Sequence, residues 1–122
     1  MFQNSLFFVE KQEVGDDSAD FSIRLNPEHR IFEGHFPGDP IVPGVCIFQI
    51  ATELFGLITP VKNPIFSVKN AKFLNIIRPL KQREVNYQLA WEPAESGYVV
   101  KASVSFEDTK FAKISFKVCS NQ

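Results

Sequence analysis

The sequence predicts an α+β protein in which an antiparallel sheet wraps around one long central helix. Several segments alternate apolar and polar residues, which is the pattern of half-buried strands. Between them, the run from Val45 to Ile58 is apolar almost throughout, as expected for a buried helix. Strands and helices of this kind become stable by packing their apolar faces together, so the helix should lie against the sheet.

Size and composition are those of a globular protein. The 122 residues suit a single domain, spanning residues 1–122, with a small core. The net charge of −1 gives no electrostatic footprint for nucleic acid, and two cysteines are too few for a disulfide framework or a metal cluster. The chain shows no signal peptide, and its apolar run is too short to span a membrane. We therefore expect a cytoplasmic protein without a membrane partner.

The elements follow in order along the chain. Strands are expected at residues 7–13 and 19–25, and the second alternates strictly. Residues 26–44 have the character of a long loop. The helix should begin near Pro43–Gly44, because proline suits a first helical turn, and it should end by Thr59–Pro60 and Asn63–Pro64.

The second half of the chain is predicted to be β-structure. Residues 65–77 should form a long strand, followed by alternating strands at 85–91, 98–106 and 112–118. Residues 107–110 are typical of a tight turn. The predicted sheet thus has five to seven strands.

The apolar helix carries one polar stripe. Gln49, Thr52, Glu53 and Gly56 are spaced i, i+3, i+4 and i+7, so they share one face. Buried polar side chains need partners. The stripe should therefore face a cavity, a subunit interface or backbone groups.

The run Gly34–Val45 holds the strongest functional signal. Three prolines and three glycines surround a single histidine, His35, directly before the apolar helix. Imidazole is the usual general base near neutral pH, and rigid loops often carry such groups. Taken without the surrounding motif, His35 is better explained as a structural loop residue that binds backbone groups.

The run resembles the HFPG-x-P-x-x-PG signature of the 3-hydroxyacyl-(acyl carrier protein) dehydratases of the hotdog-fold superfamily. Asn70–Phe73 and Arg78–Leu80 resemble later parts of the same family more weakly. The resemblance implies a hotdog fold and conversion of a 3-hydroxyacyl thioester to a trans-2-enoyl thioester, in fatty acid or related lipid synthesis. It also implies that no metal or organic cofactor is needed, and that the acyl group arrives on the phosphopantetheine of an acyl carrier protein.

The resemblance also assigns roles to residues. His35 would be the base, and the Gly44 N–H would bind the thioester oxygen, with Phe36, Pro43 and Val45 around the substrate. Members of the family are dimers in which one subunit supplies the histidine and the other supplies an acid from the helix. We therefore expect a homodimer or higher homo-oligomer, or a heterodimer with a paralogue.

This chain departs from the family at the acid. The residue fourteen positions after His35 is Gln49, where the family has Glu or Asp, and the next turn carries Glu53, where the family has glutamine. An amide does not exchange protons at useful pH. Glu53 either replaces the acid, or pairs with a nearby Arg or Lys or with the partner subunit. Gln49 either orients a water or the substrate hydroxyl, or satisfies backbone groups.

Three functions therefore remain open. The first is an active dehydratase. The second is a catalytically impaired subunit that binds acyl carrier protein or an active paralogue. The third is an acyl thioesterase, because one fold hosts several chemistries.

Two further features have ordinary explanations as well as functional ones. Cys46 near the start of the helix is either a nucleophile or, as we favour, a packed core residue. A basic cluster is either a docking surface for an acidic carrier protein or a solvated face; its members are Lys69, Lys72, Arg78, Lys81 and Arg83.

Overall fold

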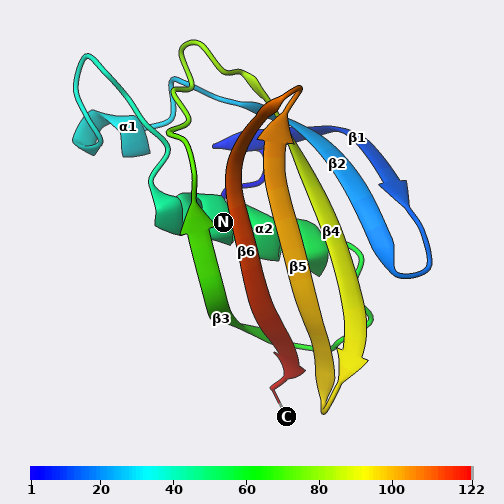
Figure 1. The fold of residues 1–122 in the computed structure, drawn as a ribbon. Helices are drawn as coiled ribbons and strands as arrows, with labels where there is room; N and C mark the ends of the chain where they lie inside the picture. The colour runs from blue at the N-terminus through cyan, green and yellow to red at the C-terminus, as the bar shows by residue number, and fades with distance from the viewer. Residues whose placement is uncertain (122) are drawn as a thin grey trace.

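The computed structural model describes residues 1–121 and confirms the α+β class and the predicted wrapping of the sheet around one helix. Its six strands form one antiparallel sheet in the order β1-β2-β4-β5-β6-β3. The strands are β1 (Phe7–Val14), β2 (Ser18–Leu25), β3 (Pro64–Phe73), β4 (Glu84–Ala94), β5 (Gly97–Phe106) and β6 (Thr109–Ser120). The helices are α1 (Ile31–Gly34) and α2 (Gly44–Gly56). Figure 1 shows α2 lying across one face of the curved sheet, with β1 and β3 at opposite edges.

The core lies between α2 and this face of the sheet. Strand β2 buries every second residue, as its alternation predicts, and α2 buries a broad apolar face. The helix residues buried there are Cys46, Ile47, Ile50, Ala51, Leu54 and Phe55. Each large apolar side chain of this kind contributes about 1.5–3 kcal/mol when it leaves water. The fully buried Tyr87 adds a directional link, because its hydroxyl donates a hydrogen bond of 3.0 Å to the Ile47 carbonyl.

The loop predicted at residues 26–44 contains a short helix, α1, that the sequence did not indicate. Asn26 starts the turn: its side-chain oxygen accepts a hydrogen bond from the Glu28 N–H, and its carbonyl accepts one from the His29 N–H. The Nδ1 atom of His29 then accepts a hydrogen bond from the Ile31 N–H. Phe32 is buried and anchors the turn, so tertiary packing decides this element.

One helix and one strand end earlier than predicted. Helix α2 ends at Gly56, because the Leu57 and Ile58 N–H groups bond to carbonyls only three residues back, which tightens the last turn. Strand β3 ends at Phe73 rather than continuing to residue 77. Beyond it the Leu74 N–H still bonds to the Phe111 carbonyl, but Ile77 turns inward and is buried.

Residues 1–6, for which the sequence made no prediction, fold back against the body of the protein. Leu6 is fully buried, and its carbonyl accepts a hydrogen bond from the Asn26 N–H. The Leu6 N–H donates to the Phe2 carbonyl and closes a compact turn. Figure 1 places the N-terminus beside α2. These residues, called the N-terminal segment below, become part of the site.

Strand β3 buries none of its residues, and β1 at the opposite edge of the sheet buries only Phe7. Strand β3 pairs with β6 along one side only and forms an edge of the sheet. Its exposed apolar residues continue into the segment that follows it; they are Ile65, Val68, Phe73, Leu74, Ile76 and Leu80. An apolar edge strand of this length is the kind of surface that another chain covers. Within residues 1–121, no helix is both long enough and apolar enough to cross a membrane.

Candidate active site

The motif loop leads from α1 into α2 and is held by backbone hydrogen bonds. The Ile41 N–H donates to the His35 carbonyl at 3.0 Å, and the Val42 N–H donates to the Ile77 carbonyl at 2.9 Å. Gly38 adopts φ +84°, a conformation that favours glycine. The loop is therefore a fixed structure around the histidine, as its prolines and glycines predicted.

His35 is exposed at the end of α1. Its Nδ1 atom lies 3.2 Å from the Ile31 carbonyl oxygen. A carbonyl oxygen only accepts hydrogen bonds, so this contact assigns the proton to Nδ1. In the neutral form of the ring, the lone pair then lies on the other nitrogen, Nε2.

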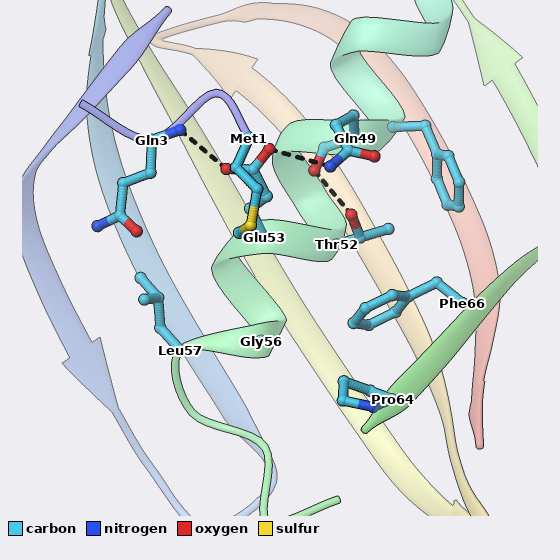
Figure 2. A pocket seen from close by; sticks show the side chains of 10 residues that line it. Met1, Gln3, Gln49, Thr52, Glu53, Gly56, Leu57, Pro64 and Phe66 are labelled. Atoms are coloured by element: carbon cyan, nitrogen blue, oxygen red, sulfur yellow. Dashed lines mark hydrogen bonds between the residues drawn. The ribbon is translucent and has the colours of Figure 1, made fainter. Parts of the chain in front are cut away.

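The polar stripe of α2 faces a cavity, as its spacing predicted. Figure 2 shows the stripe beside the N-terminal segment and the first residues of β3. The cavity has a volume of about 490 Å³. Its lining residues are Met1, Gln3, Phe48, Gln49, Thr52, Glu53, Gly56, Leu57, Pro64 and Phe66.

Glu53 is 5% exposed, and both its carboxylate oxygens accept hydrogen bonds. The Phe2 N–H lies 2.9 Å from Oε1 and 2.8 Å from Oε2, and the Gln3 N–H donates to Oε1 at 2.8 Å. The Gln49 amide nitrogen donates to Oε2 at 3.0 Å. The carboxylate thus ties the N-terminal segment to α2.

The same contact fixes the orientation of Gln49. Its amide nitrogen points to the Glu53 carboxylate, which leaves its carbonyl oxygen, Oε1, as the free acceptor. Thr52 donates its hydroxyl to the Gln49 backbone carbonyl at 2.8 Å. Among the described residues, no hydrogen bond joins His35 to Gln49 or Glu53. The chain therefore brings the exchanged pair together but leaves the histidine apart from it.

The start of α2 presents the predicted substrate-binding residues. Pro43 is the N-cap, so the first N–H groups of the helix have no preceding turn to bond to. The ring of Phe73 packs so closely on Gly44 that a Cβ there would lie 2.9 Å from the ring. Phe36 and Val45 are exposed, by 54% and 73% respectively. The exposure of Val45 corrects the expectation that the helix is buried all round.

The remaining predicted features have simpler settings. In the basic cluster, Arg78 pairs with Asp39 of the motif loop at 3.3 Å, and both side chains are exposed. Exposed ion pairs contribute little stability. This one links the segment after β3 to the motif loop. Cys46 is 2% exposed, and burial raises the pKa of its thiol, which favours the core role over a nucleophilic one.

The N-terminal segment is the part of the site that sequence reasoning missed. Phe2 and Leu6 in its short apolar pattern were the only signal that it packs inward. Its contact with Glu53 spans about fifty residues of sequence and uses backbone N–H groups, which every residue except proline carries. No residue type marks such a contact in advance.

Comparison with known proteins identifies relatives over most of the chain. A model of the ApeI-like family, described as ApeI dehydratase, matches residues 11–118. The chain is 32% identical over 120 residues to the 3-hydroxyacyl-(acyl-carrier-protein) dehydratase FabZ of Clostridium acetobutylicum. The aligned region covers 90% of this chain and 83% of that relative. It is 40% identical over 63 residues to the protein of the same name from Fusobacterium nucleatum, where it spans 43% of the relative's length.

Solved structures bear on the fold. The chain superposes on a protein of the dehydratase heterocomplex ApeI:P from Xenorhabdus doucetiae with a TM-score of 0.69 and 21% identity, over 92% of this chain and 96% of that chain. A thioesterase from Haemophilus influenzae shares the fold with a TM-score of 0.58 and 14% identity, over 95% and 80% of the two chains. The hotdog architecture predicted from the motif is therefore confirmed.

The two cysteines provide a test of the site's packing. We expect iodoacetamide to alkylate Cys46 more slowly than the half-exposed Cys119 in the folded protein, by roughly tenfold or more, because a buried thiol with a raised pKa forms little thiolate. Mass spectrometry of peptides from timed reactions measures both rates. The difference should vanish in urea, and equal rates in the folded protein would contradict the burial of Cys46.

Proposed function

This chain belongs to the ApeI-like dehydratase family, and on that premise we propose that it removes water from 3-hydroxyacyl thioesters carried by an acyl carrier protein. The observation that carries the proposal is the contact of 3.2 Å between His35 Nδ1 and the Ile31 carbonyl oxygen. From it we infer a tautomer with the proton on Nδ1, which leaves Nε2 as the basic nitrogen. A base so oriented is suited to take the proton from C2, next to the thioester carbonyl.

The enolate that forms on loss of this proton needs stabilisation at the thioester oxygen. The first turn of α2 offers unpaired N–H groups, and the dipole of the helix favours negative charge there. We assign this role to the Gly44 N–H, in line with the family motif. An N–H group already in place stabilises the developing charge without having to reorganise during the reaction.

Elimination is complete when the C3–O bond breaks and water leaves. The free Oε1 atom of Gln49 can accept a hydrogen bond from the 3-hydroxyl and so orient it, but it has no proton to give. The Glu53 carboxylate is engaged by N–H donors on both oxygens. In our proposal the leaving hydroxyl therefore takes its proton from the His35 imidazolium, and the electron pair of the C2–H bond becomes the C2=C3 double bond.

A second copy of the chain would bring His35 near the helix stripe. Strand β3 presents an exposed apolar edge, and Phe36 and Val45 extend exposed apolar surface toward the motif loop. Pairing β3 with β3 of another subunit would satisfy this edge and join two sheets. We propose a homodimer in which His35 of one subunit serves the α2 stripe of the other.

The rival proposal is a subunit that depends on a different partner chain. Two observations favour it: Gln49 stands at the position of the acid, and the solved protein from Xenorhabdus doucetiae is described as part of a heterocomplex. A paralogue with its own helix acid would then complete the site. For either assembly we propose a cytoplasmic location, the reducing compartment in which Cys46 and Cys119 stay unpaired.

We expect His35→Ala to lower kcat/KM for dehydration by roughly 10²-fold or more, which is what a positioned base contributes. The fold should persist, because backbone hydrogen bonds hold the motif loop. The assay follows the enoyl thioester formed from a 3-hydroxyacyl carrier-protein substrate, with thiol release measured in parallel to detect thioester hydrolysis. Undiminished turnover in the folded variant would remove His35 from the mechanism, and thiol release without enoyl product would favour a thioesterase.

Substitutions at Gln49 and Glu53 distinguish an enzyme that is active alone from a subunit that depends on a partner chain. If a general acid is missing, Gln49→Glu should raise the dehydration rate by up to about 10²–10⁴-fold. The new carboxylate would face Glu53, and two carboxylates in contact raise each other's pKa. The double variant Gln49→Glu with Glu53→Gln avoids this repulsion and should gain more than the single one. If neither variant nor the wild type turns over alone, and an added active paralogue restores the rate, the dependent subunit is the correct description.

The dimer is tested by mass in solution. Sedimentation equilibrium should give twice the chain mass of 13.9 kDa at micromolar concentration. Val68→Asp places a charge on the exposed apolar part of β3 and should shift the equilibrium toward monomer. Val14→Asp is the matched control, because Val14 is equally exposed but lies at the opposite edge, in β1. A stable monomer for the wild type would contradict the proposal.

A further inference from the structure

The charges of the chain are sorted by strand. Strands β3, β5 and β6 carry six lysines and no acidic residue, whereas all 14 acidic residues of the chain lie elsewhere. The six are Lys69, Lys72, Lys101, Lys110, Lys113 and Lys117. The three strands are neighbours in the sheet, in the order β5-β6-β3. A chain whose net charge is only −1 therefore has one strongly cationic region.

Four of these lysines project from the outer face of the sheet, away from α2. Lys101, Lys113 and Lys117 are exposed, and the two strand neighbours of each are buried on the helix side. Lys72 lies directly opposite Lys113 in the register of β3 and β6, so their side chains share a face. Figure 1 shows this face of the sheet in front, with α2 behind it. The four residues are called the lysine face below.

The lysine face is electrostatically unfavourable by itself. Like charges directly opposite on neighbouring strands destabilise a sheet, and Lys72 and Lys113 are placed in this way. Lys101 lies opposite Ser115, and the residues diagonal to it on β6 are both lysines, 113 and 117. No ion pair within residues 1–121 involves any of the four. An anion bound among them would therefore relieve repulsion as well as make contacts.

The lysine face contains a depression whose donors suit a phosphate group. Its volume is about 340 Å³, and its polar lining comes from Asn70, Lys101, Ser103, Lys113 and Ser115. In the register, Ser115 lies between Asn70 on β3 and Lys101 on β5. Ammonium, hydroxyl and amide groups all donate hydrogen bonds, and none of these lining residues is acidic. A phosphate group offers about two negative charges and three acceptor oxygens to such donors.

The depression is separate from the candidate active site. It shares no lining residue with the cavity beside the α2 stripe, which lies on the other side of the sheet. Pairing of β3 with another subunit would extend the sheet in its own plane, because ladder hydrogen bonds run between strands. The outer face would stay open in such a dimer.

We propose that the lysine face is a binding site for a phosphate-bearing ligand, centred on Ser115, with Lys101 and Lys113 as its main cationic contacts. The donors converge on one depression instead of following the length of a strand, which favours a compact anionic group over an extended acidic polypeptide. Free phosphorylated molecules and phospholipid headgroups both carry such a group, and the experiment separates them. The proposal goes beyond the dehydratase function and does not rest on it.

Calorimetric titration with inorganic pyrophosphate, without divalent cations and at constant ionic strength, tests the site. We expect saturable binding to the wild type. Ser115→Ala keeps every charge and should weaken binding by roughly three- to tenfold, because it removes one hydrogen-bond donor. The double variant Lys101→Gln with Lys113→Gln should weaken binding by roughly tenfold or more. Lys11→Gln is the matched control, because it removes the same charge from an exposed position in β1, at the opposite edge, and should bind as the wild type does.

Thermal unfolding provides an independent readout. In chloride alone, Lys113→Gln should unfold at a higher temperature than the wild type, because it removes the like-charge pair with Lys72. Pyrophosphate should raise the unfolding temperature of the wild type and raise that of the variant less, because a ligand stabilises the state that binds it. Equal responses of the wild type to pyrophosphate and to sodium chloride at the same ionic strength would indicate only solvated lysines and would overturn the proposal.

Vesicles separate the two sources of phosphate. Co-sedimentation with phosphatidylcholine vesicles that contain phosphatidylglycerol, lost in the double lysine variant, would support a headgroup as the ligand. Pyrophosphate binding without vesicle binding would support a free phosphorylated molecule. The proposal fails if pyrophosphate shows no saturable binding, or if Ser115→Ala binds as tightly as the wild type. Amide shifts at Lys113 and Ser115 in the NMR spectrum with an acidic carrier protein but not with pyrophosphate would indicate a protein-docking surface and would also overturn it. None of these outcomes depends on dehydration activity.

Discussion

The packing of α2 against the curved face of the sheet is the constraint on which the rest of the structure depends. The helix buries its apolar face, and the Tyr87 hydroxyl fixes its axial position through the Ile47 carbonyl. Once that face is turned inward, helical geometry decides where the remaining side chains point. Gln49 and Glu53 therefore emerge on the side where the N-terminal segment and β3 approach. The site is a consequence of how the core packs.

Glu53 connects this core to the part of the chain that is otherwise least constrained. A nearly buried carboxylate is costly to desolvate unless it is well hydrogen-bonded, and here three N–H donors satisfy it. Two donors belong to the backbone of the N-terminal segment, and the third orients Gln49. A carboxylate at position 53 and an amide at position 49 therefore have structural consequences as well as chemical ones. This arrangement gives the carboxylate a structural task and leaves an amide oxygen as the free acceptor.

The proposed base, His35, and the polar stripe of α2 are not joined within the described part of one chain, and strand β3 leaves an exposed edge. His35 is exposed on a rigid loop, and strand β3 ends the sheet with an apolar edge. A polar stripe needs hydrogen-bond partners, and an exposed apolar edge strand needs to be covered. A second chain can provide both. This is the physical reason to treat the oligomer as part of the proposed mechanism.

The sequence by itself determined the features that depend on local patterns. Period-two alternation located four of the strands, and the apolar run located α2. The spacing of Gln49, Thr52 and Glu53 predicted that the stripe would face a cavity, a subunit interface or backbone groups, and it lines a cavity. The motif loop is held by backbone hydrogen bonds, and Gly38 adopts a positive φ that favours glycine. Only the tertiary structure decided α1, the early end of β3 and the docking of the N-terminal segment on Glu53. These depend on contacts between residues far apart in sequence, often through backbone N–H groups that leave no signature in the choice of side chain.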